Sequence, residues 1–539
     1  MNQRLQRTSL RAGLWAVLSL LAVAGCGGND QDSGSDGPVS AEAPVVHAVG
    51  DPVNGKQVFR FETFGNERFW TDALRLQQGV MATNVTPVQA LQLGLMVDSD
   101  ALDAATLATI VAEAKTDLSP AKAPVLNDPA TTIALINANA IVGIVAKDSG
   151  NEGSIDIKKA SKTGASCALC HTITDGSVLS LAGAGSIGKR LDGRANHVLN
   201  FGRLIATGLN TRAYYPVLQL ALNANGGKTL GRAPTGLTPT STEAEVDAYL
   251  SNPAYYPVGS FDDTVDGNGD PQHNSALFRT DLAAPWGTEG GIARLDNFSN
   301  LVYTALLDPT NLTTAGGRAF LRKFGGTAAG NEIADGYVQV LTATGVTGYP
   351  YVQAAASPAA GTEEAPTGVR VDNKKLLDMN GYLNSLQAPP GIVADAAAGA
   401  RGRVLFRQNC TACHNVDQSK AVPAFTVPMK TIFPGDNPVV LLAMRDPPFN
   451  PILDTPGNIY DDKAAVVNAS QRGGIRGSVM PLLLDLARKP NFLHDNSVPT
   501  LDNLLDPVRS ATAPHPFYFA STADRADMVE FLRGLSTTP

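Results

Sequence analysis

The chain has 539 residues, of which 42 are Lys or Arg and 50 are Asp or Glu, so its formal net charge is -8. Nucleic-acid-binding proteins usually carry an excess of positive charge that neutralises phosphates, and this chain has a net negative charge. No nucleic acid is therefore expected among its partners. The length suffices for two to four domains. A hydrophobic content of 43%, with 52 Gly and 35 Pro, predicts a folded, loop-rich protein.

The first 25 residues are predicted to be a lipoprotein signal peptide. Three arginines give a positive start, and the apolar run over residues 12–24 is too short to span a bilayer. The run ends in Val-Ala-Gly before Cys26, which resembles a bacterial lipobox and implies lipidation of Cys26. An ordinary cleaved signal with an incidental cysteine is the alternative. Since Gly27 follows Cys26, the resemblance implies a periplasm-facing lipoprotein of the outer membrane, bound to the membrane through this anchor.

The rest of the chain is predicted to be mainly α, because few stretches alternate between apolar and polar residues. Residues 26–45 are small, polar and acidic, which predicts a flexible tether. A helical region is expected over 46–150, where Thr86 and Pro87 form a helix start and a second helix covers 100–115. Gly, Pro, Thr, Asn and Asp dominate residues 225–300, which predicts a long irregular insertion.

An internal repeat divides the chain. Residues 378–386 read DMNGYLNSL and residues 527–535 read DMVEFLRGL, and each predicts the end of an amphipathic helix. The segment QAPPG at 387–391 predicts a helix stop and a linker. We therefore expect a first unit over 151–388, with a long insertion, and a second unit of the same plan over 394–539.

Four of the five cysteines fall in two Cys-x-x-Cys-His motifs. The motifs are Cys167-Ala168-Leu169-Cys170-His171 and Cys410-Thr411-Ala412-Cys413-His414. On one helical turn, positions i, i+3 and i+4 share a face, so two thiols can bond the vinyl groups of one haem while the histidine meets the iron. The spacing predicts two covalently bound haem c groups, with His171 and His414 as proximal iron ligands.

The sequence gives less support to two other functions of Cys-x-x-Cys-His motifs, a redox-active dithiol and a zinc site. A thioredoxin-like dithiol requires a βαβ surround, which the sequence lacks. A zinc site would join ligands that already stand adjacent within each motif.

Two stretches resemble known haem proteins. The run ARGRVLFRQNCTACH at 400–414, with the closing FLRGL, is similar to a class I cytochrome c domain. The run KPNFLHDNSVPTLDNLLDP at 489–507 resembles the His-Asp-Gly-Ser and Thr-Leu stretch of the bacterial di-haem cytochrome c peroxidase superfamily. That superfamily includes the methylamine-utilisation di-haem enzyme and the di-haem rubber oxygenases. Asn496 stands where the superfamily usually has Gly.

The resemblance covers 394–539 and the surroundings of the first motif. It implies two class I cytochrome c-like domains that face one another. One haem would meet the substrate or oxidant, and the other would handle electrons.

The sixth iron ligands decide whether such haems catalyse or only transfer electrons. His197 follows the first motif by a short loop and is the candidate there, with an open position as the alternative. For the second haem, His515 stands where the superfamily places its ligand. Met480 has the Met-Pro context of electron-transfer cytochromes, and Tyr518 is a third choice. His494 is expected to hydrogen-bond structurally.

Other residues are given structural roles. Met429 is expected to pack, His47 and His273 to lie in solvated loops, and Trp286 to pack at an interface and not to relay electrons. Glu67, beside Trp70, precedes the first motif and receives no catalytic role. Calcium is an alternative for one oxygen-rich loop, but the spacing does not match an EF-hand and a solvated turn is expected. The loop contains Asp262, Asp263, Asp266 and Asp270.

The function predicted from the sequence is that of an exported di-haem c-type cytochrome, a haem-dependent oxidoreductase or electron-transfer protein. Its partner would be a redox protein or a small oxidant, and a peroxidase- or oxygenase-like enzyme is one version. The rival is a non-enzymatic electron carrier with both haems six-coordinate. A third alternative is a structural lipoprotein whose motifs hold no haem.

Overall fold

The computed structural model describes most of the chain beyond residue 48. The described residues are 49–229, 231–284, 286–287, 292–410, 414, 481–493, 495–509, 515 and 517–536, with the backbone alone of 440–444 and 463–467. The predicted signal peptide, Cys26 and the tether lie outside the described residues, as do His47, Cys413, Met429, Met480 and His494.

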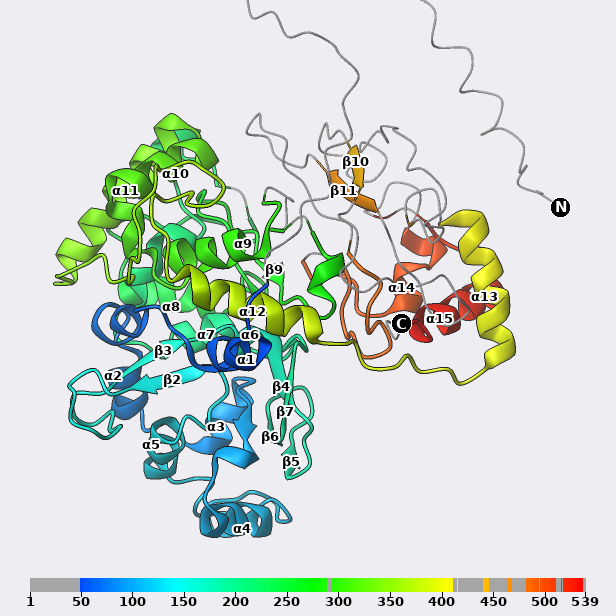
Figure 1. Ribbon diagram of the computed structural model, residues 1–539, viewed down its shortest axis with the longest axis horizontal. Helices are drawn as coiled ribbons and strands as arrows, with labels where there is room; N and C mark the ends of the chain where they lie inside the picture. Colours follow the sequence, from blue (N-terminus) through cyan, green and yellow to red (C-terminus); the bar gives the residue numbers. More distant parts are fainter. Residues whose placement is uncertain are drawn as a thin grey trace, which may run out of the picture. The chain divides into compact units, whose positions relative to one another are not determined.

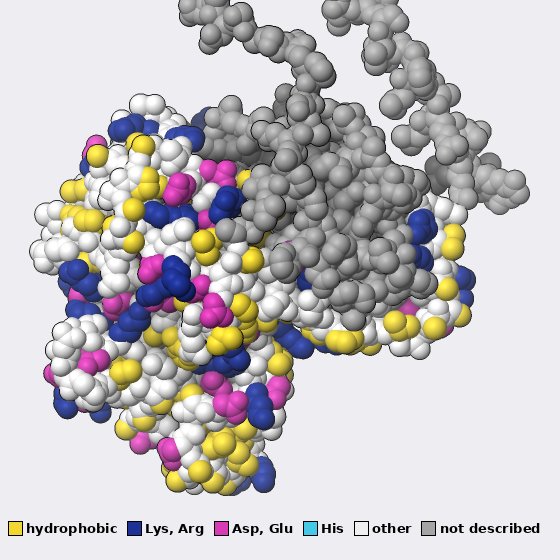
Figure 2. All heavy atoms as spheres, in the orientation of Figure 1, with side chains coloured by type: hydrophobic (Ala, Val, Ile, Leu, Met, Phe, Trp, Pro, Cys, Tyr) yellow, Lys and Arg dark blue, Asp and Glu magenta, His cyan; other side chains and the backbone are white. Residues whose placement is uncertain are grey.

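The described chain is mainly α, which confirms this part of the predicted fold class. Strands have two to five residues, whereas the helix α11 has 17. Each helix described is too short or too polar to traverse a bilayer. Where Figure 2 colours the side chains, basic, acidic and hydrophobic groups are scattered over the surface.

Two pairs of helices form the framework. The first pair is α1 (Pro52–Phe61) and α12 (Asn373–Ser385), which lie side by side (Figure 1). A Cβ atom at Gly55 would come within 1.9 Å of the Asp378 carbonyl oxygen, so only glycine permits this approach. One turn further along α1, the rings of Phe59 and Tyr382 lie 5.9 Å apart between centroids.

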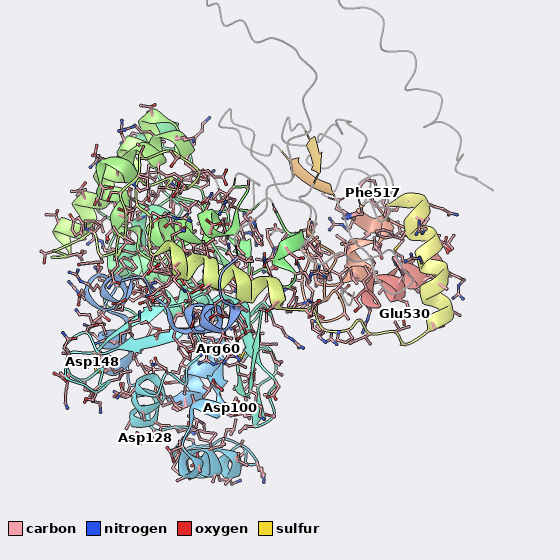
Figure 3. The ribbon with its side chains drawn as sticks, viewed as in Figure 1. Arg60, Asp100, Asp128, Asp148, Phe517 and Glu530 are labelled. Atoms are coloured by element: carbon pink, nitrogen blue, oxygen red, sulfur yellow. The ribbon has the colours of Figure 1, made fainter. Side chains whose placement is uncertain are left out.

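The second pair is α13 (Ala396–Asn409) and α15 (Thr522–Arg533). A Cβ atom at Gly402 would lie 2.0 Å from the Asp527 carbonyl oxygen, and the rings of Phe406 and Phe531 are 5.4 Å apart. Glu530, labelled in Figure 3, accepts a hydrogen bond from the Asp395 N–H and so ties the start of α13 to α15.

The two pairs therefore follow one plan. Each joins a Gly-x-x-x-Phe helix to one of the repeat helices predicted at 378–386 and 527–535, and both repeats are helical, as expected. The structure extends the repeat to α1, whereas the sequence predicts this segment to belong to the separate region 46–150. One hydrophobic core contains buried residues from Val58 to Leu383, and a smaller core surrounds Phe406 and Phe531.

The remaining elements are short. The other helices are α2 (Leu76–Ala82), α3 (Pro87–Gln92), α4 (Ala104–Glu113), α5 (Pro129–Asn137), α6 (Ala168–His171), α7 (Phe201–Ile205), α8 (Glu243–Ser251), α9 (Leu295–Leu301), α10 (Ala315–Gly325), α11 (Thr327–Ala343) and α14 (Leu501–Leu504). Short 3-10 or π-helical turns cover Phe69–Ala73, Ser99–Ala101, Thr211–Val217, Asn223–Asn225, Thr280–Leu282, Val302–Leu306, Pro309–Thr313 and Pro507–Arg509.

The strands form small sheets. Strand β6 (Ser186–Gly188) pairs parallel with β1 (Val97–Asp98) and antiparallel with β5 (Leu179–Ser180). The antiparallel pairs are β2 (Ile144–Lys147) with β3 (Lys162–Ala165), β4 (Thr172–Thr174) with β7 (Arg190–Asp192), β8 (Ser260–Phe261) with β9 (Gln272–His273), and β10 (Val440–Met444) with β11 (Lys463–Val467).

Local sequence signals explain where helices begin. Thr86 caps α3 through a complete capping box with Gln89, which confirms the predicted start. Asp103 caps α4, inside the helix predicted over 100–115. The described residues of 225–300 are irregular apart from α8, the start of α9, short turns and the β8–β9 hairpin, as the composition predicts.

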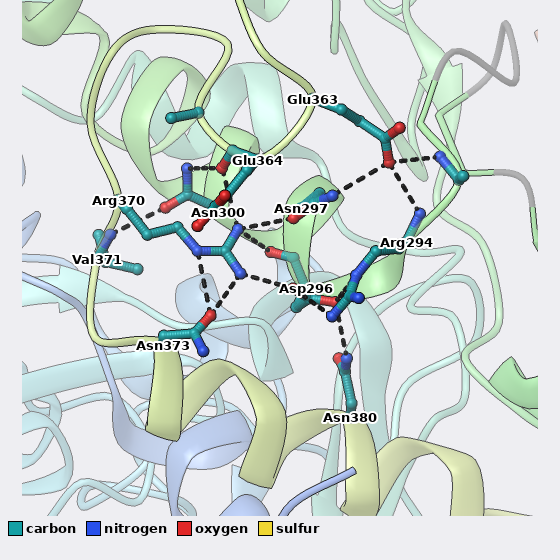
Figure 4. A network of polar contacts seen from close by, with 12 residues as sticks. Arg294, Asp296, Asn297, Asn300, Glu363, Glu364, Arg370, Val371, Asn373 and Asn380 are labelled. Carbon is teal, nitrogen blue, oxygen red and sulfur yellow. Dashed lines mark hydrogen bonds and ion pairs between the residues drawn. The ribbon is translucent and has the colours of Figure 1, made fainter. Parts of the chain in front are cut away.

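A buried polar network holds α12 in place (Figure 4). The Arg370 guanidinium lies 2.6 Å from Asp296 Oδ2, and both side chains are less than 5% exposed. Arg370 also donates to Asn373 at the start of α12, and Asn380 donates to Asp296 from the middle of this helix. Burial alone would raise the pKa of Asp296, but Arg294 and Arg370 outweigh it and lower the pKa.

Candidate haem sites

Both Cys-x-x-Cys-His motifs contain the same helical hydrogen bond. The His171 N–H donates to the Cys167 carbonyl at 3.2 Å, and the His414 N–H donates to the Cys410 carbonyl at 2.8 Å. In the first motif, Ala168–His171 forms the one-turn helix α6, so the local backbone is helical as the spacing predicts.

A long insertion separates the first motif from the helix that corresponds to α13. Cys410 follows directly after α13, whereas residues 62–166 separate α1 from Cys167. The Ser166 hydroxyl donates to the Arg60 carbonyl at 2.8 Å, and Figure 3 labels Arg60 on α1. The insertion therefore returns the motif to the last turn of α1, the place that corresponds to the end of α13.

The His171 ring is held in one tautomer. Its Nδ1 lies 2.7 Å from the carbonyl oxygen of Ser275. A carbonyl can only accept, so Nδ1 carries the proton and Nε2 keeps its lone pair. Burial lowers the pKa of His171, although the bond to Ser275 acts in the opposite direction. A neutral imidazole with Nε2 as its acceptor is the form that ligates haem iron.

The thiols of the first motif are reduced and half-buried. Burial raises the pKa of Cys167 to about 11, and burial together with Cys167 raises that of Cys170 to about 12. Dithiol redox centres need the opposite shift, because the thiolate is the nucleophile. A neutral thioether suits this apolar setting, so the residues present fit covalent haem attachment.

Two side chains cover the first cysteine. The Tyr303 hydroxyl lies 3.2 Å from Cys167 Sγ and donates to the Glu62 carbonyl at 3.2 Å. Met379 Sδ, from α12, lies 3.9 Å from the same sulfur. Tyr303 is 1% exposed and stands in the π-helical turn Val302–Leu306, a type of turn that is frequent at functional sites.

Glu62 ties this site to two lysines. Its carboxylate accepts from Lys147 at 2.9 Å, from Lys375 and from two backbone N–H groups. Burial alone would raise the pKa of Glu62, but Lys147, Lys375 and the Phe64 N–H outweigh it and lower the pKa to about 2. This carboxylate therefore stabilises the fold above pH 4.5, and the contribution is lost as the pH falls from 4.5 towards 2.

Glu62→Gln is expected to lower the free energy of unfolding by about 2 kcal/mol at pH 7, less than the full linkage value because both lysines are partly exposed. The difference from wild type should shrink as the pH falls from 4.5 towards 2. Denaturant unfolding at several pH values measures it, with Glu152→Gln in an exposed loop as the control. A difference that does not change with pH would contradict the assignment.

At the second site the structure brings His515 into electrostatic range of His414. Burial lowers the pKa of His515 to about 4, followed by the charges of His414 and Arg509. Its Nδ1 is buried and has no hydrogen-bond partner among the described residues. His515 also has a φ of 54°, a conformation that costs energy and is enriched at functional positions. Tyr518 is 40% exposed.

His197 lies in a different setting. Burial and the positive charge of Lys489 lower its pKa to about 4, and its Nδ1 has no hydrogen-bond partner in the described chain. Lys489 Nζ lies 3.1 Å from His273 Nε2. The expectation of a solvated loop is therefore wrong for His273, which is half-buried on β9. The distal role of His197 stays a prediction.

Asn496 has a φ of 58°, in the left-handed region. Glycine enters this region without strain, and Asn is enriched there among other residues. The backbone thus explains how Asn can stand where the resembled superfamily usually has Gly.

The remaining candidates are packed. Glu67 is 6% exposed and accepts from the Thr63 hydroxyl, while the Trp70 indole donates to the Leu307 carbonyl at 3.1 Å. Trp286 stacks on Phe298, with centroids 6.3 Å apart, as expected for a packed indole.

A basic pocket of about 330 Å³ lies close to the first motif. Asp192 is the one acidic residue among its described lining, and it pairs with Arg60 at 2.6 Å. The next residue, Gly193, donates to the His171 carbonyl at 2.9 Å. Arg190 pairs with the buried Asp98, so the positive charge that the pocket presents near the first haem motif comes mainly from Lys56 and Arg194. Its basic residues are Lys56, Arg60, Arg190 and Arg194.

Comparisons with known proteins do not identify a family. No family model matches the chain, and no curated protein matches it. A solved structure of hydrazine synthase from Kuenenia stuttgartiensis aligns over 51% of this chain and 76% of its own. The identity is 14% and the TM-score is 0.25, which is too low to establish a shared fold.

Residues missed by the sequence analysis carry much of the first site. Ser275 contributes a backbone carbonyl, and no side-chain pattern marks such a role. The Gly-x-x-x-Phe spacing at 55–59, repeated at 402–406, was a usable signal for α1.

Proposed function

We propose that this chain is a di-haem c-type cytochrome, exported and lipid-anchored at Cys26, that exchanges electrons with a redox partner protein or a small oxidant. The observation that carries the proposal is the His171 imidazole, held by Ser275 with Nε2 as its acceptor beside two half-buried free thiols on one helical turn. In the second motif the His414 N–H donates to the Cys410 carbonyl, as the His171 N–H does to the Cys167 carbonyl in the first. Export and anchoring rest on the sequence of residues 1–26 alone.

When bound, haem c supplies a one-electron iron couple. His171 and His414 would hold the two irons, and the paired thiols at 167, 170, 410 and 413 would hold the macrocycles. Ser275 fixes the ring of His171, while Tyr303 and Met379 contact the sulfur of Cys167. The basic pocket near the first motif favours a partner surface or a small molecule with acidic groups.

The two sites differ in a way that bears on catalysis. The pKa of His515 responds to His414, which supports a second haem with histidine on both sides. The pKa of His171 responds to burial and to Ser275, with no contribution from another imidazole among the described residues. We propose an exchangeable sixth position at the first haem, and with it the peroxidase- or oxygenase-like version over the pure carrier.

Carbon monoxide titration of the fully reduced protein tests this version. Wild type is expected to bind one carbon monoxide per two haems, and His515→Ala is expected to bind two. His197→Ala should stay at one if the first position is already open. If wild type binds none, both haems are six-coordinate and the carrier is correct. If His515→Ala binds no more than wild type, His515 does not ligate the second iron.

A further inference from the structure

The basic pocket beside the first motif lies where α1, β7 and the end of α12 meet. Lys56 and Arg60 come from α1, Arg190 and Asp192 from β7, and Tyr382 from α12. Its volume of about 330 Å³ is at the lower end of the range of small-molecule sites in proteins. The hollow is therefore large enough for a small organic molecule.

Two of the four basic residues of the pocket are already neutralised. The Arg190 side chain is 2% exposed and pairs with Asp98 at 2.5 Å. Arg60 pairs with Asp192 at 2.6 Å, and the same carboxylate oxygen accepts from the Tyr382 hydroxyl at 2.6 Å. Both guanidinium groups thus hold the wall of the pocket together and leave no surplus of charge.

The other two cations, Lys56 and Arg194, have no such partner. Neither side chain donates a hydrogen bond to an acceptor within the described part of the chain. Arg194 is half-buried, and burial lowers its pKa; Asp485 acts in the opposite direction, and Arg488 lowers the pKa further. Asp485 itself pairs with Arg488. A half-buried guanidinium has lost hydration that an acceptor in the pocket would replace.

The pocket also offers an apolar wall. Phe278 and Pro389 are buried, and Leu191 and Leu386 are half-buried, whereas the Gln387 amide is exposed. A ligand with a carbon body between its charged groups would bury that body against these side chains. The lining therefore suits an organic anion better than a bare inorganic one.

A protein partner fits these observations less well than a small molecule. Electrostatic recognition between proteins depends on many charges spread over an exposed surface. Here the surplus is two cations, and both line one hollow.

The wall of the pocket is joined to the first motif by a two-stranded sheet. Strand β7, which lines the pocket, pairs with β4, which begins directly after His171. The Thr172 hydroxyl donates to Asp192 at 3.1 Å, and the Gly193 N–H donates to the His171 carbonyl at 2.9 Å. A molecule in the pocket would thus lie beside the segment that presents the proximal histidine.

We infer that this pocket binds a small organic molecule with two acidic groups. Two such groups balance the two unpaired cations, so Lys56 would bind one of them and Arg194 the other, while the apolar side chains contact the body of the molecule. The inference names the chemical class of the small molecule that the proposed function leaves open, and it rests on that function for the role of the molecule beside the haem.

Isothermal titration of the purified full chain with succinate at low ionic strength tests the inference. We expect one succinate per chain, with a dissociation constant between about 10⁻⁵ and 10⁻³ M. Succinamide has the same length without charge and should not bind in this range. Added salt should weaken the binding of succinate, because both cations are partly exposed.

Lys56→Gln and Arg194→Gln are each expected to weaken the binding of succinate at least tenfold. Both side chains lack hydrogen-bond partners among the described residues, so both variants should melt as wild type does. Lys158→Gln and Arg203→Gln remove the same charges from exposed positions outside the pocket lining, and they should bind succinate as wild type does.

The inference is overturned if wild type does not bind succinate at millimolar concentration, or if succinamide binds equally well. It is also overturned if Lys56→Gln and Arg194→Gln bind as tightly as wild type, or if the two control variants lose as much affinity as they do. The titration does not require haem, so failure here is distinguishable from failure of the proposed function.

Discussion

Cys167→Ser combined with Cys170→Ser is expected to yield a chain that carries one covalent haem fewer than wild type, while the second motif keeps its own. The physical reason is that serine cannot form the thioether bonds, and His171 alone would hold the haem only by coordination. The serine hydroxyls replace half-buried thiols, so we also expect a loss of about 1–3 kcal/mol in the free energy of unfolding.

The mass of the denatured chain and a haem stain after denaturing electrophoresis measure this loss. Met379→Leu is the matched control, because it keeps the volume beside Cys167 without touching the thiols, and it should retain both haems. If the double serine variant has the same number of attached haems as wild type, the first motif is not an attachment site.

Gly55→Ala and Gly402→Ala are each expected to lower the free energy of unfolding by about 2–3 kcal/mol. In both helices the added Cβ would meet a backbone carbonyl of the partner helix, at 1.9 Å from Asp378 and 2.0 Å from Asp527. Backbone cannot rotate away as a side chain can, so the helices must separate. Since α1 and α12 flank the first motif, Gly55→Ala should also alter the absorption of the first haem.

Gly399→Ala is the control for the second helix pair, because Gly399 lies on the same helix, one turn before Gly402, and has nothing within 4 Å. There alanine should stabilise the chain by about 0.5–1 kcal/mol through its higher helix propensity. Chemical denaturation of the three variants and of wild type measures these differences in the free energy of unfolding. Equal stabilities of Gly399→Ala and Gly402→Ala would contradict the close crossing of α13 and α15.

Local features were predictable from the sequence. The caps at Thr86 and Asp103, the turn at Cys167–His171 and the two repeat helices all depend on residues within four or five positions. Such signals act through backbone hydrogen bonds of one turn, and a single sequence contains all of them.

Long-range placements were not predictable. Ser275 lies 104 positions from His171, and Tyr303 lies 136 positions from Cys167. No periodicity relates such pairs, because they are set by how the insertions fold back. The pairing of α1 with the first motif was also not predictable, because residues 62–166 separate the two in the sequence. The Gly-x-x-x-Phe spacing of α1 nevertheless matches that of α13.

The acidic loop between β8 and β9 is partly buried, whereas the sequence predicts a solvated turn. The sequence places four aspartates among Gly, Thr and Asn, a composition typical of exposed turns. In the structure Asp262 is buried, beside the aromatic residues Tyr249 and Tyr256, and its backbone N–H donates to the Tyr256 hydroxyl at 2.9 Å. Composition alone does not reveal which acidic loop a fold will enclose.

The most direct test of this account is the mass of the denatured wild-type chain purified from a host that attaches haem c. We predict that the chain carries two macrocycles, and that its reduced spectrum is that of haem c. A colourless protein whose mass equals that of its polypeptide would contradict the central claim.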